Sequence, residues 1–214
     1  MIRGVIFDMD GVLVDSERII CEAAVRMFAE RGLAVRSEDF LPFVGAGENR
    51  YLGGVAEKYG FPFDLERDKA RTYRFYDEMV RGRLQPLPGV ADFIARCRAK
   101  GLRLAVATSA DEVKLGINLR ELGLPPGTFD ALVNGLDVER RKPAPDIFLL
   151  AAERLGLPAP DCLVVEDAIN GLAAAHAAGA RCLALTTSFP REQLAGADFI
   201  AGTLADAPDA ALEW

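Results

Sequence analysis

Five short apolar runs recur along this 214-residue chain, with helical patterns between most of them. They are RGVIF at 3–7, LRLAVAT at 102–108, ALVNG at 131–135, CLVVED at 162–167 and CLALTT at 182–187. Strands rich in Val, Ile, Leu and Ala along their whole length are typical of a parallel sheet that is buried on both faces. The pattern therefore predicts an open α/β fold in which right-handed crossovers join the strands.

The segments between the runs have the period and the ends of helices. Residues 89–100 place apolar side chains at positions i, i+3, i+4 and i+7, between a proline and a glycine. Residues 145–155 and the Ala-rich residues 168–178 are each followed by a glycine as well. Strands that alternate with helices of this length are typical of parallel α/β units.

One long stretch, from Ser16 to about Arg83, interrupts the alternation. It shows helical patterns and no convincing strand, and every fourth residue from Arg18 to Glu30 is charged, which makes a polar stripe opposite apolar residues. We predict that residues 16–83 form an all-helical domain inserted after the first strand. The α/β core would then comprise residues 1–15 and 84–214.

The composition of the chain narrows the classes of partner that it could bind. The chain has 32 acidic and 25 basic residues, a formal charge of −7, so we expect neither nucleic acid nor an anionic membrane as a partner. Four widely spaced cysteines in apolar surroundings favour reduced core thiols and a cytoplasmic protein. Apolar runs of 18 residues are absent, so we expect no signal peptide and no membrane span.

Two carboxylates, Asp8 and Asp10, follow the first apolar run. Residues i and i+2 of an extended segment project to the same side, and ligands of open α/β sheets bind at the carboxyl ends of the strands. The simpler reading, a turn at Asp10-Gly11, accounts for one Asp but not for the other. Because two close carboxylates repel, the site needs a cation or one raised pKa, which favours Mg²⁺ and a general acid.

Other strand ends carry further polar groups. Thr108 and Ser109 precede a helix that opens near Asp111, and hydroxyls with free N–H groups there would bind an anion, although both residues are also ordinary helix caps. Lys142 lies in the loop RRKPAPDIF, where a lysine is usually solvated. Glu166 and Asp167 end the fourth run, where they could simply cap a helix.

Taken together, these groups suit phosphoryl transfer. One Asp would attack phosphorus, Mg²⁺ and the lysine would neutralise the phosphoryl oxygens, and the second Asp would serve the leaving group and then water.

The motifs DMDGV, TS, KP and ED, in this order, resemble those of the haloacid dehalogenase-like superfamily. The helical insert after the first motif resembles the cap of its phosphoglycolate phosphatase and β-phosphoglucomutase branch. The resemblance covers nearly the whole chain and implies a Rossmann-like, doubly wound parallel sheet with an inserted all-helical cap domain.

The resemblance also implies roles for individual residues. Asp8 would be the nucleophile that becomes an aspartyl-phosphate, Asp10 the general acid/base, and Lys142 the bridge between Asp8 and a phosphoryl oxygen. The phosphate would lie against Gly11, Thr108, Ser109 and Ala110, and Mg²⁺ against Asp8, the Asp10 carbonyl, Asp167 and Glu166. Asp15, at the exit toward the insert, and Arg50, in the insert, would contact the substrate, with Arg71 and Arg74 as further candidates.

Within the family, the second Asp of DMDGV favours phosphoryl chemistry over dehalogenation. The mutases carry a His where this chain has Ile19 and Ile20, and a cap lysine that the loop FVGAGENR lacks. The same loop lacks the third glycine of a dinucleotide fingerprint, and the lone His176 has no partner in sequence, so we expect a structural role for it.

The sequence therefore predicts a Mg²⁺-dependent phosphatase that acts on small phosphorylated metabolites of the sugar phosphate or phosphoglycolate type. It would be a monomer or a weak homodimer. A β-phosphoglucomutase-like mutase and a non-catalytic interaction module remain as alternatives.

Overall fold

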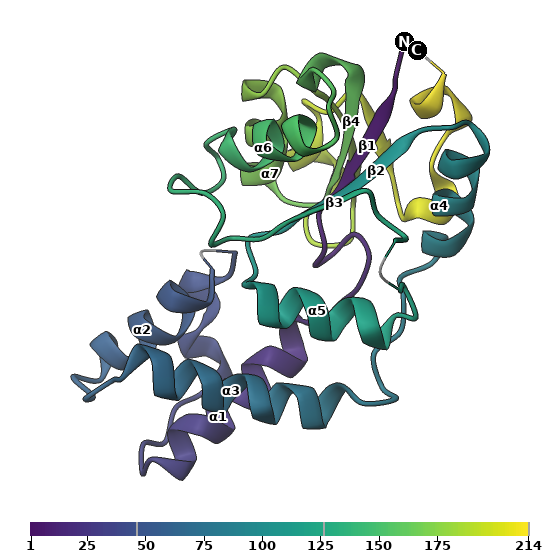
Figure 1. Ribbon diagram of the computed structural model, residues 1–214. Helices are drawn as coiled ribbons and strands as arrows, with labels where there is room; N and C mark the ends of the chain where they lie inside the picture. The colour runs from purple at the N-terminus through teal and green to yellow at the C-terminus, as the bar shows by residue number, and fades with distance from the viewer. Residues whose placement is uncertain (46, 126, 214) are drawn as a thin grey trace.

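The apolar runs form a single parallel sheet at the centre of the computed structural model, which describes residues 1–45, 47–125 and 127–213 (Figure 1). Its strands are β1 (Gly4–Phe7), β2 (Arg103–Ala107), β3 (Ala131–Val133), β4 (Cys162–Glu166), β5 (Arg181–Leu185) and β6 (Phe199–Ala201). The helices are α1 (Glu17–Glu30), α2 (Glu48–Lys58), α3 (Leu65–Val80), α4 (Val90–Ala99), α5 (Glu112–Glu121), α6 (Asp146–Arg154) and α7 (Ile169–Ala177).

The strand order is β3-β2-β1-β4-β5-β6, with every neighbouring pair parallel. This order confirms the predicted doubly wound α/β fold and places β1 between β2 and β4. The sequence pattern missed β6, a three-residue edge strand, because Phe199 and Ile200 are only partly buried and the run is too short to show a period.

Alternate residues of each strand pack on opposite faces of the sheet. Phe7 points to the face that α4 covers, where its ring contacts that of Phe93 edge-on at 6.0 Å. Ile6 points to the other face, which α6 and α7 cover (Figure 1). These three helices are the ones predicted from residues 89–100, 145–155 and 168–178.

Helices α1, α2 and α3 form a helical region beyond the carboxyl ends of the strands (Figure 1). The described part of this stretch contains no strand, which confirms the predicted helical cap. The chain leaves and re-enters the core through adjacent segments: Val14 and Pro86 form an antiparallel bridge, and the Leu87 N–H donates to the Leu13 carbonyl at 2.9 Å. The domain boundaries at residues 16 and 83 stay a prediction.

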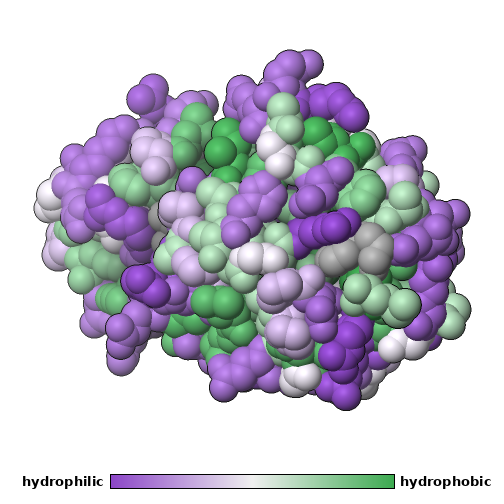
Figure 2. Space-filling view, turned by 90° about the horizontal axis from the view of Figure 1, so that it is seen from above, coloured by the Kyte–Doolittle hydropathy of each residue, from purple (hydrophilic) through white to green (hydrophobic). Residues whose placement is uncertain are grey.

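Seen from the end of the core opposite the helical region, the surface alternates between hydrophilic residues and small hydrophobic patches (Figure 2). In the part of the chain that the structure describes, no helix has both the length and the apolar character needed to cross a membrane. The four cysteines lie in this part as free thiols, three of them buried.

Candidate active site

A sharp turn directly after β1 places Asp8 and Asp10 at the carboxyl end of the sheet. The Asp8 N–H donates to the Val165 carbonyl at 2.9 Å and so extends the pairing of β1 with β4. Gly11 has a φ of 78°, and a side chain at this position would collide with the Asp167 carboxylate. Glycine therefore serves both the turn and the close approach of Asp167 to the loop.

Lys142 reaches Asp8 from the loop that precedes α6. Its ammonium donates to Asp8 Oδ1 and to Glu166 Oε1, each at 2.6 Å. The second Glu166 oxygen accepts the N–H groups of Asp167 and Ala168, both at 2.8 Å. Burial lowers the pKa of Lys142, but Asp8 and Glu166 outweigh burial and hold that pKa above its usual range. Lys142 is thus a fixed positive charge that Glu166 positions.

The end of β2 supplies a hydroxyl and backbone groups. The buried Thr108 continues β2, because its N–H donates to the Val133 carbonyl at 3.0 Å. Its Oγ1 accepts the Ala110 N–H at 3.1 Å, so the hydroxyl hydrogen is free to donate to a ligand. Helix α5 begins two residues after Ala110, and its N-terminal dipole favours an anion there.

These groups line one cavity of about 690 Å³, a size within the roughly 300–1,000 Å³ of small-molecule sites. The structure brings most of the predicted site residues into its wall: Asp8, Asp10, Gly11, Asp15, Thr108, Ser109, Ala110, Lys142, Glu166 and Asp167.

The carboxylates of this cavity are poorly balanced by positive charge. Burial raises the pKa of Asp8 to about 7, although Lys142 lowers it. Burial, followed by the charges of Glu166 and Asp8, raises the pKa of Asp167 to about 8. A bound cation would relieve this repulsion, so the residues present fit a divalent metal.

The site suits a metal ion that takes few of its ligands from the protein. Among the described residues, no group of three or more acidic, His or Cys side chains converges on one point. Mg²⁺ is commonly held by one or two carboxylates, with water and phosphate oxygens completing its shell, and such a site needs no larger cluster.

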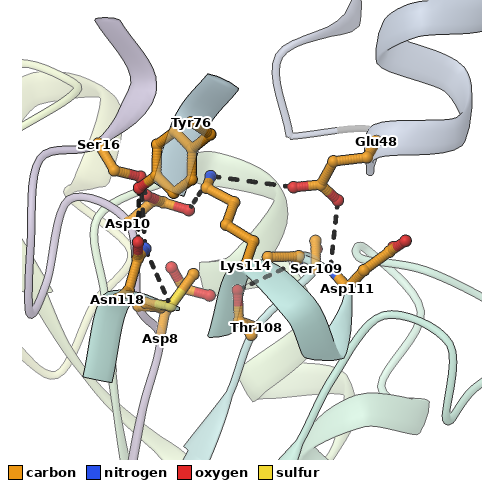
Figure 3. A network of polar contacts seen from close by, with 12 residues as sticks. Asp8, Asp10, Ser16, Glu48, Tyr76, Thr108, Ser109, Asp111, Lys114 and Asn118 are labelled. Atoms are coloured by element: carbon orange, nitrogen blue, oxygen red, sulfur yellow. Dashed lines mark hydrogen bonds and ion pairs between the residues drawn. The ribbon is translucent and has the colours of Figure 1, made fainter. Parts of the chain in front are cut away.

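A second buried lysine, which the sequence did not reveal, lies beside Asp10 (Figure 3). Lys114 on α5 donates to Asp10 Oδ2 at 2.8 Å, and its Nζ lies 3.9 Å from Glu48 Oε1. Burial lowers the pKa of Lys114, but Asp10 and Glu48 outweigh burial and raise that pKa above its usual range. The sequence signal that could have revealed Lys114 was its position on the buried side of a helix, next to Leu115.

The other oxygen of Asp10 accepts the Ser16 hydroxyl, at the point where the chain enters the helical region (Figure 3). The Asn118 amide donates to Ser16 Oγ at 3.5 Å, and the Tyr76 hydroxyl donates to Asn118 Oδ1 at 2.5 Å. Asp10 is therefore tied to α3 through a buried chain of hydrogen bonds.

Glu48 links α2 to the start of α5. Its Oε2 accepts the Asp111 N–H at 3.2 Å, while Oε1 faces Lys114 (Figure 3). Burial raises the pKa of Glu48 to about 7, and Lys114 opposes that rise.

The loop after β5 adds two residues that the sequence did not suggest. The Ser188 hydroxyl donates to Asp167 Oδ2, and the Thr187 hydroxyl donates to the Gly11 carbonyl at 2.5 Å. The available signal was their position at the end of the run CLALTT, since all parallel strands end at the same edge of the sheet.

Arg50, predicted to contact the substrate, lies outside the cavity wall. Its guanidinium pairs with Glu57 at 2.6 Å and lies 5.0 Å from the centre of the Phe43 ring. Glu48, which lines the cavity, is two residues earlier, and two residues turn an α-helix through roughly 200°. The two side chains therefore leave α2 on nearly opposite sides, and the structure does not bring Arg50 to the site.

The remaining candidates also lie elsewhere. Arg71 and Arg74 line a different hollow, where Arg71 pairs with Glu30 at 2.8 Å. His176 lies 3.7 Å from Asp198 and is not part of the cavity wall.

A doubly wound sheet with an inserted helical cap, and an Asp-x-Asp pair beside a buried lysine, define the class of capped α/β hydrolases. The chain belongs to the haloacid dehalogenase-like hydrolases, since the family described as haloacid dehalogenase-like hydrolase matches residues 2–179.

Two relatives illustrate the range of this similarity. The chain is 45% identical over 190 residues to Protein SUPPRESSOR OF QUENCHING 1, chloroplastic, of Arabidopsis thaliana, which covers 87% of this chain and 18% of that much longer protein. It is 33% identical over 177 residues to the phosphorylated carbohydrates phosphatase of Thermotoga maritima, covering 83% of this chain and 82% of the relative.

Among solved structures, CbbY from Rhodobacter sphaeroides in complex with phosphate superimposes with a TM-score of 0.89 at 28% identity and covers 100% of both chains. A mutant of CbbY in complex with xylulose-(1,5)bisphosphate gives a TM-score of 0.85 over 96% of both chains, again at 28% identity.

Proposed function

We propose that this protein is a Mg²⁺-dependent phosphatase that hydrolyses phosphomonoesters of small metabolites through an aspartyl-phosphate. The substrates would be of the sugar phosphate or phosphoglycolate type. The observation that carries the proposal is the buried Asp8 carboxylate, held 2.6 Å from the Lys142 ammonium in a cavity that Asp10 and Thr108 also line. The similarity to a carbohydrate phosphatase and to a phosphate-bound CbbY supports it.

In the first half of the reaction, the Asp8 carboxylate attacks phosphorus. A bond forms between an Asp8 oxygen and phosphorus, and the bond from phosphorus to the ester oxygen breaks. Asp10, which receives a proton as the phosphate anion binds beside it, gives that proton to the departing oxygen. Lys142 and the Thr108 hydroxyl stabilise the charge that develops on the phosphoryl oxygens.

In the second half, water attacks the aspartyl-phosphate. Asp10, now ionised, accepts the proton of the water, inorganic phosphate leaves, and Asp8 returns to its starting state. The contacts of Asp10 with Lys114 and Ser16 fix the position of its carboxylate for both proton transfers.

The metal would be held by the carboxylates of Asp8 and Asp167 and by the Asp10 carbonyl. Glu166, also predicted as a ligand, has both oxygens occupied by Lys142 and by backbone N–H groups, which favours a role in positioning Lys142. When bound, Mg²⁺ supplies positive charge to the oxygens of the transferring group.

The mutase alternative is less well supported. Ile20 is buried in the cavity wall, near the position where the mutases carry a histidine. The cavity residues that the structure describes in the helical region include no lysine or arginine. The cytoplasmic location and the oligomeric state stay predictions, and the Arabidopsis relative is named as chloroplastic.

Phosphate release from a panel of sugar phosphates and phosphoglycolate, with Mg²⁺ and with a chelator, tests the proposal. We expect release that requires Mg²⁺ and that falls about 10²–10³-fold in Lys142→Met, the range for losing one group that stabilises developing charge. The exposed Lys100, replaced by Met, is the matched control. Release that persists in the chelator, or that Lys142→Met leaves unchanged, would contradict the proposal.

A further inference from the structure

The loop that follows β2 lines the cavity, and a side chain from outside the cavity holds it. Arg141, the residue before Lys142, donates from its guanidinium to the Ser109 carbonyl at 3.2 Å. The Arg141 side chain is half-buried, is not part of the cavity wall, and forms no ion pair with a carboxylate among the described residues. Its hydrogen bond is therefore directed at the backbone of the loop.

This hydrogen bond sets the orientation of one peptide group. The Ser109 carbonyl and the Ala110 N–H belong to the same planar trans peptide, in which they point in opposite directions. The N–H donates to Thr108 Oγ1 at 3.1 Å, while Arg141 holds the carbonyl at the other side of the peptide. If the peptide turned over, its carbonyl oxygen would repel a phosphate, and the Thr108 hydroxyl would lose the contact that leaves its hydrogen free for a ligand.

Two glycines leave the space that these groups occupy. A side chain at Gly135, in the loop after β3, would collide with the Ser109 carbonyl oxygen. A side chain at Gly47, directly before α2, would collide with the Arg141 guanidinium. The guanidinium thus lies where two loops of the core meet the helical region.

The helical region covers the same loop through α2. Glu48, next to Gly47, accepts the Asp111 N–H at 3.2 Å (Figure 3). Because the guanidinium packs between Gly47 and Ser109, the start of α2 shields its hydrogen bond from water. A hydrogen bond in such surroundings is stronger than one in water.

Resting on the proposed phosphatase function, we infer that Arg141 is a positioning residue for the phosphate. It holds the Ser109 peptide with its carbonyl turned away from the cavity and keeps the Thr108 hydroxyl free to donate. It also places a positive charge behind the loop. Gly47 of the helical region keeps the guanidinium in place, so Arg141 acts through the backbone of the loop rather than by contact with the substrate.

Binding of inorganic phosphate in the presence of Mg²⁺, measured by titration calorimetry, tests this role without turnover. Arg141→Ala should weaken phosphate binding at least about tenfold, the lower end of the range for losing a hydrogen bond of a charged group. Arg140→Ala is the matched control, because the neighbouring Arg140 is 73% exposed and pairs with Asp146 outside the cavity. Arg141→Lys, which keeps the charge and a donor, should recover part of the affinity.

Steady-state kinetics with phenyl phosphate separate positioning from a loss of folded protein. The loop binds the phosphoryl group in both the ground state and the transition state, so KM of Arg141→Ala should rise by about the factor seen for phosphate binding. Its kcat should fall less than about threefold. A variant that merely lost folded protein would show a lower kcat and an unchanged KM.

Gly47→Ala examines the same contact while Arg141 stays in place. The added methyl group displaces the guanidinium, so phosphate binding should weaken in this variant too. Gly32→Ala is the control for backbone strain, because the φ of Gly32 is 83° against 79° at Gly47 and no described atom lies within 4 Å of the added methyl. In the Arg141→Ala background, Gly47→Ala should cause little further loss, since the two residues act through one contact.

The outcomes distinguish this inference from the proposed function. If the unmodified protein neither binds phosphate nor hydrolyses phenyl phosphate, the proposed function fails and this inference fails with it. If it does both, but Arg141→Ala binds phosphate as tightly as Arg140→Ala, the inference alone is overturned. If Arg141→Ala does not fold, the other pair decides: Gly47→Ala that binds phosphate as tightly as Gly32→Ala overturns the inference, and weaker binding supports it.

Discussion

Replacement of Lys114 by Met removes the positive charge that lies between Asp10 and Glu48. At an effective dielectric constant of about 20, unit charges 2.8 Å apart attract by about 6 kcal/mol, and Glu48, 3.9 Å away, adds up to about 4 kcal/mol above about pH 7, where it is ionised. Part of this attraction offsets the cost of burying the ammonium, and breaking a buried pair costs about 3–5 kcal/mol in practice. Because the Asp10 side chain is 28% exposed and keeps its contact with Ser16, we expect a loss of about 3 kcal/mol in the free energy of unfolding.

The same change should lower kcat more than it alters KM, because Lys114 contacts the proton-transfer group. Acid–base catalysis contributes about 10²–10⁴-fold, so a displaced Asp10 carboxylate should cost on the order of 10²-fold in kcat. KM should change less than about threefold, since Lys142 and Thr108 would still hold the phosphate.

Urea unfolding gives the change in the free energy of unfolding, and steady-state phosphate release on the same preparation gives the changes in kcat and KM. Lys100→Met is the control, because Lys100 is 40% exposed and pairs with Glu213 at 3.3 Å, a surface contact worth about 0–1 kcal/mol. A Lys114→Met protein that loses stability but keeps its kcat would refute the idea that Lys114 positions Asp10. One that keeps its full stability would refute the buried ion pair itself.

Three further outcomes follow from the site. Burial raises the pKa of Glu48 from 4.5 to about 7, so the folded protein holds a proton that the unfolded chain releases, and stability falls as pH rises through this window. Glu48→Gln should reduce that fall by about 3 kcal/mol in urea unfolding between about pH 5 and pH 8, and an unaltered pH profile would argue against the shift. Mg²⁺ at about 100 times its Kd should stabilise the protein by about 2.7 kcal/mol in thermal unfolding, and Asp167→Asn should remove most of this effect; equal stabilisation of both proteins would exclude Asp167 as a ligand. Arg50→Ala should leave kcat and KM within about twofold, because its ion pair is exposed, and a tenfold rise in KM would return Arg50 to the substrate.

The sheet could be predicted because its signal is local. Four of the five strands expected from apolar runs are buried on both faces, and the fifth, β3, exposes Leu132 at the edge of the sheet; each run is followed or preceded by a segment of helical period. Strand β6 gave no such signal, since Phe199 and Ile200 are only partly buried and the short run FIA lies between Asp198 and Gly202. The inserted helical region was recognised from the polar stripe between Arg18 and Glu30 and from the absence of a convincing strand.

The core of the site could be predicted because the topology of the sheet determines where its residues lie. In a parallel sheet, the residues that follow neighbouring strands meet at one edge, so Asp8, Thr108 and Asp167 were within reach of sequence reasoning. The contact of Lys114 with Asp10 spans 104 positions and depends on how α5 packs beneath the helical region, which no local pattern encodes.

The misplacement of Arg50 has a similar cause. Arg50 was expected to contact the substrate from the loop FVGAGENR, but α2 begins at Glu48, so Arg50 already belongs to its first turn. The residue at which a helix starts decides which of its side chains face a cavity. If the start shifts by two residues, each side chain turns to nearly the opposite side of the helix. Sequence alone did not fix that starting point.

The central claim is that Asp8 carries the phosphoryl group during turnover. The most direct measurement is a rapid acid quench during turnover of an aryl monophosphate, whose good leaving group departs without a proton from Asp10, followed by mass spectrometry of the peptides. It compares the unmodified protein with Asp10→Asn, where loss of the base should slow breakdown of the intermediate. We predict one phosphoryl group on Asp8, more of it in Asp10→Asn, and neither label nor turnover in Asp8→Asn. Turnover that survives in Asp8→Asn, or a phosphoryl group on any other residue, would contradict the account.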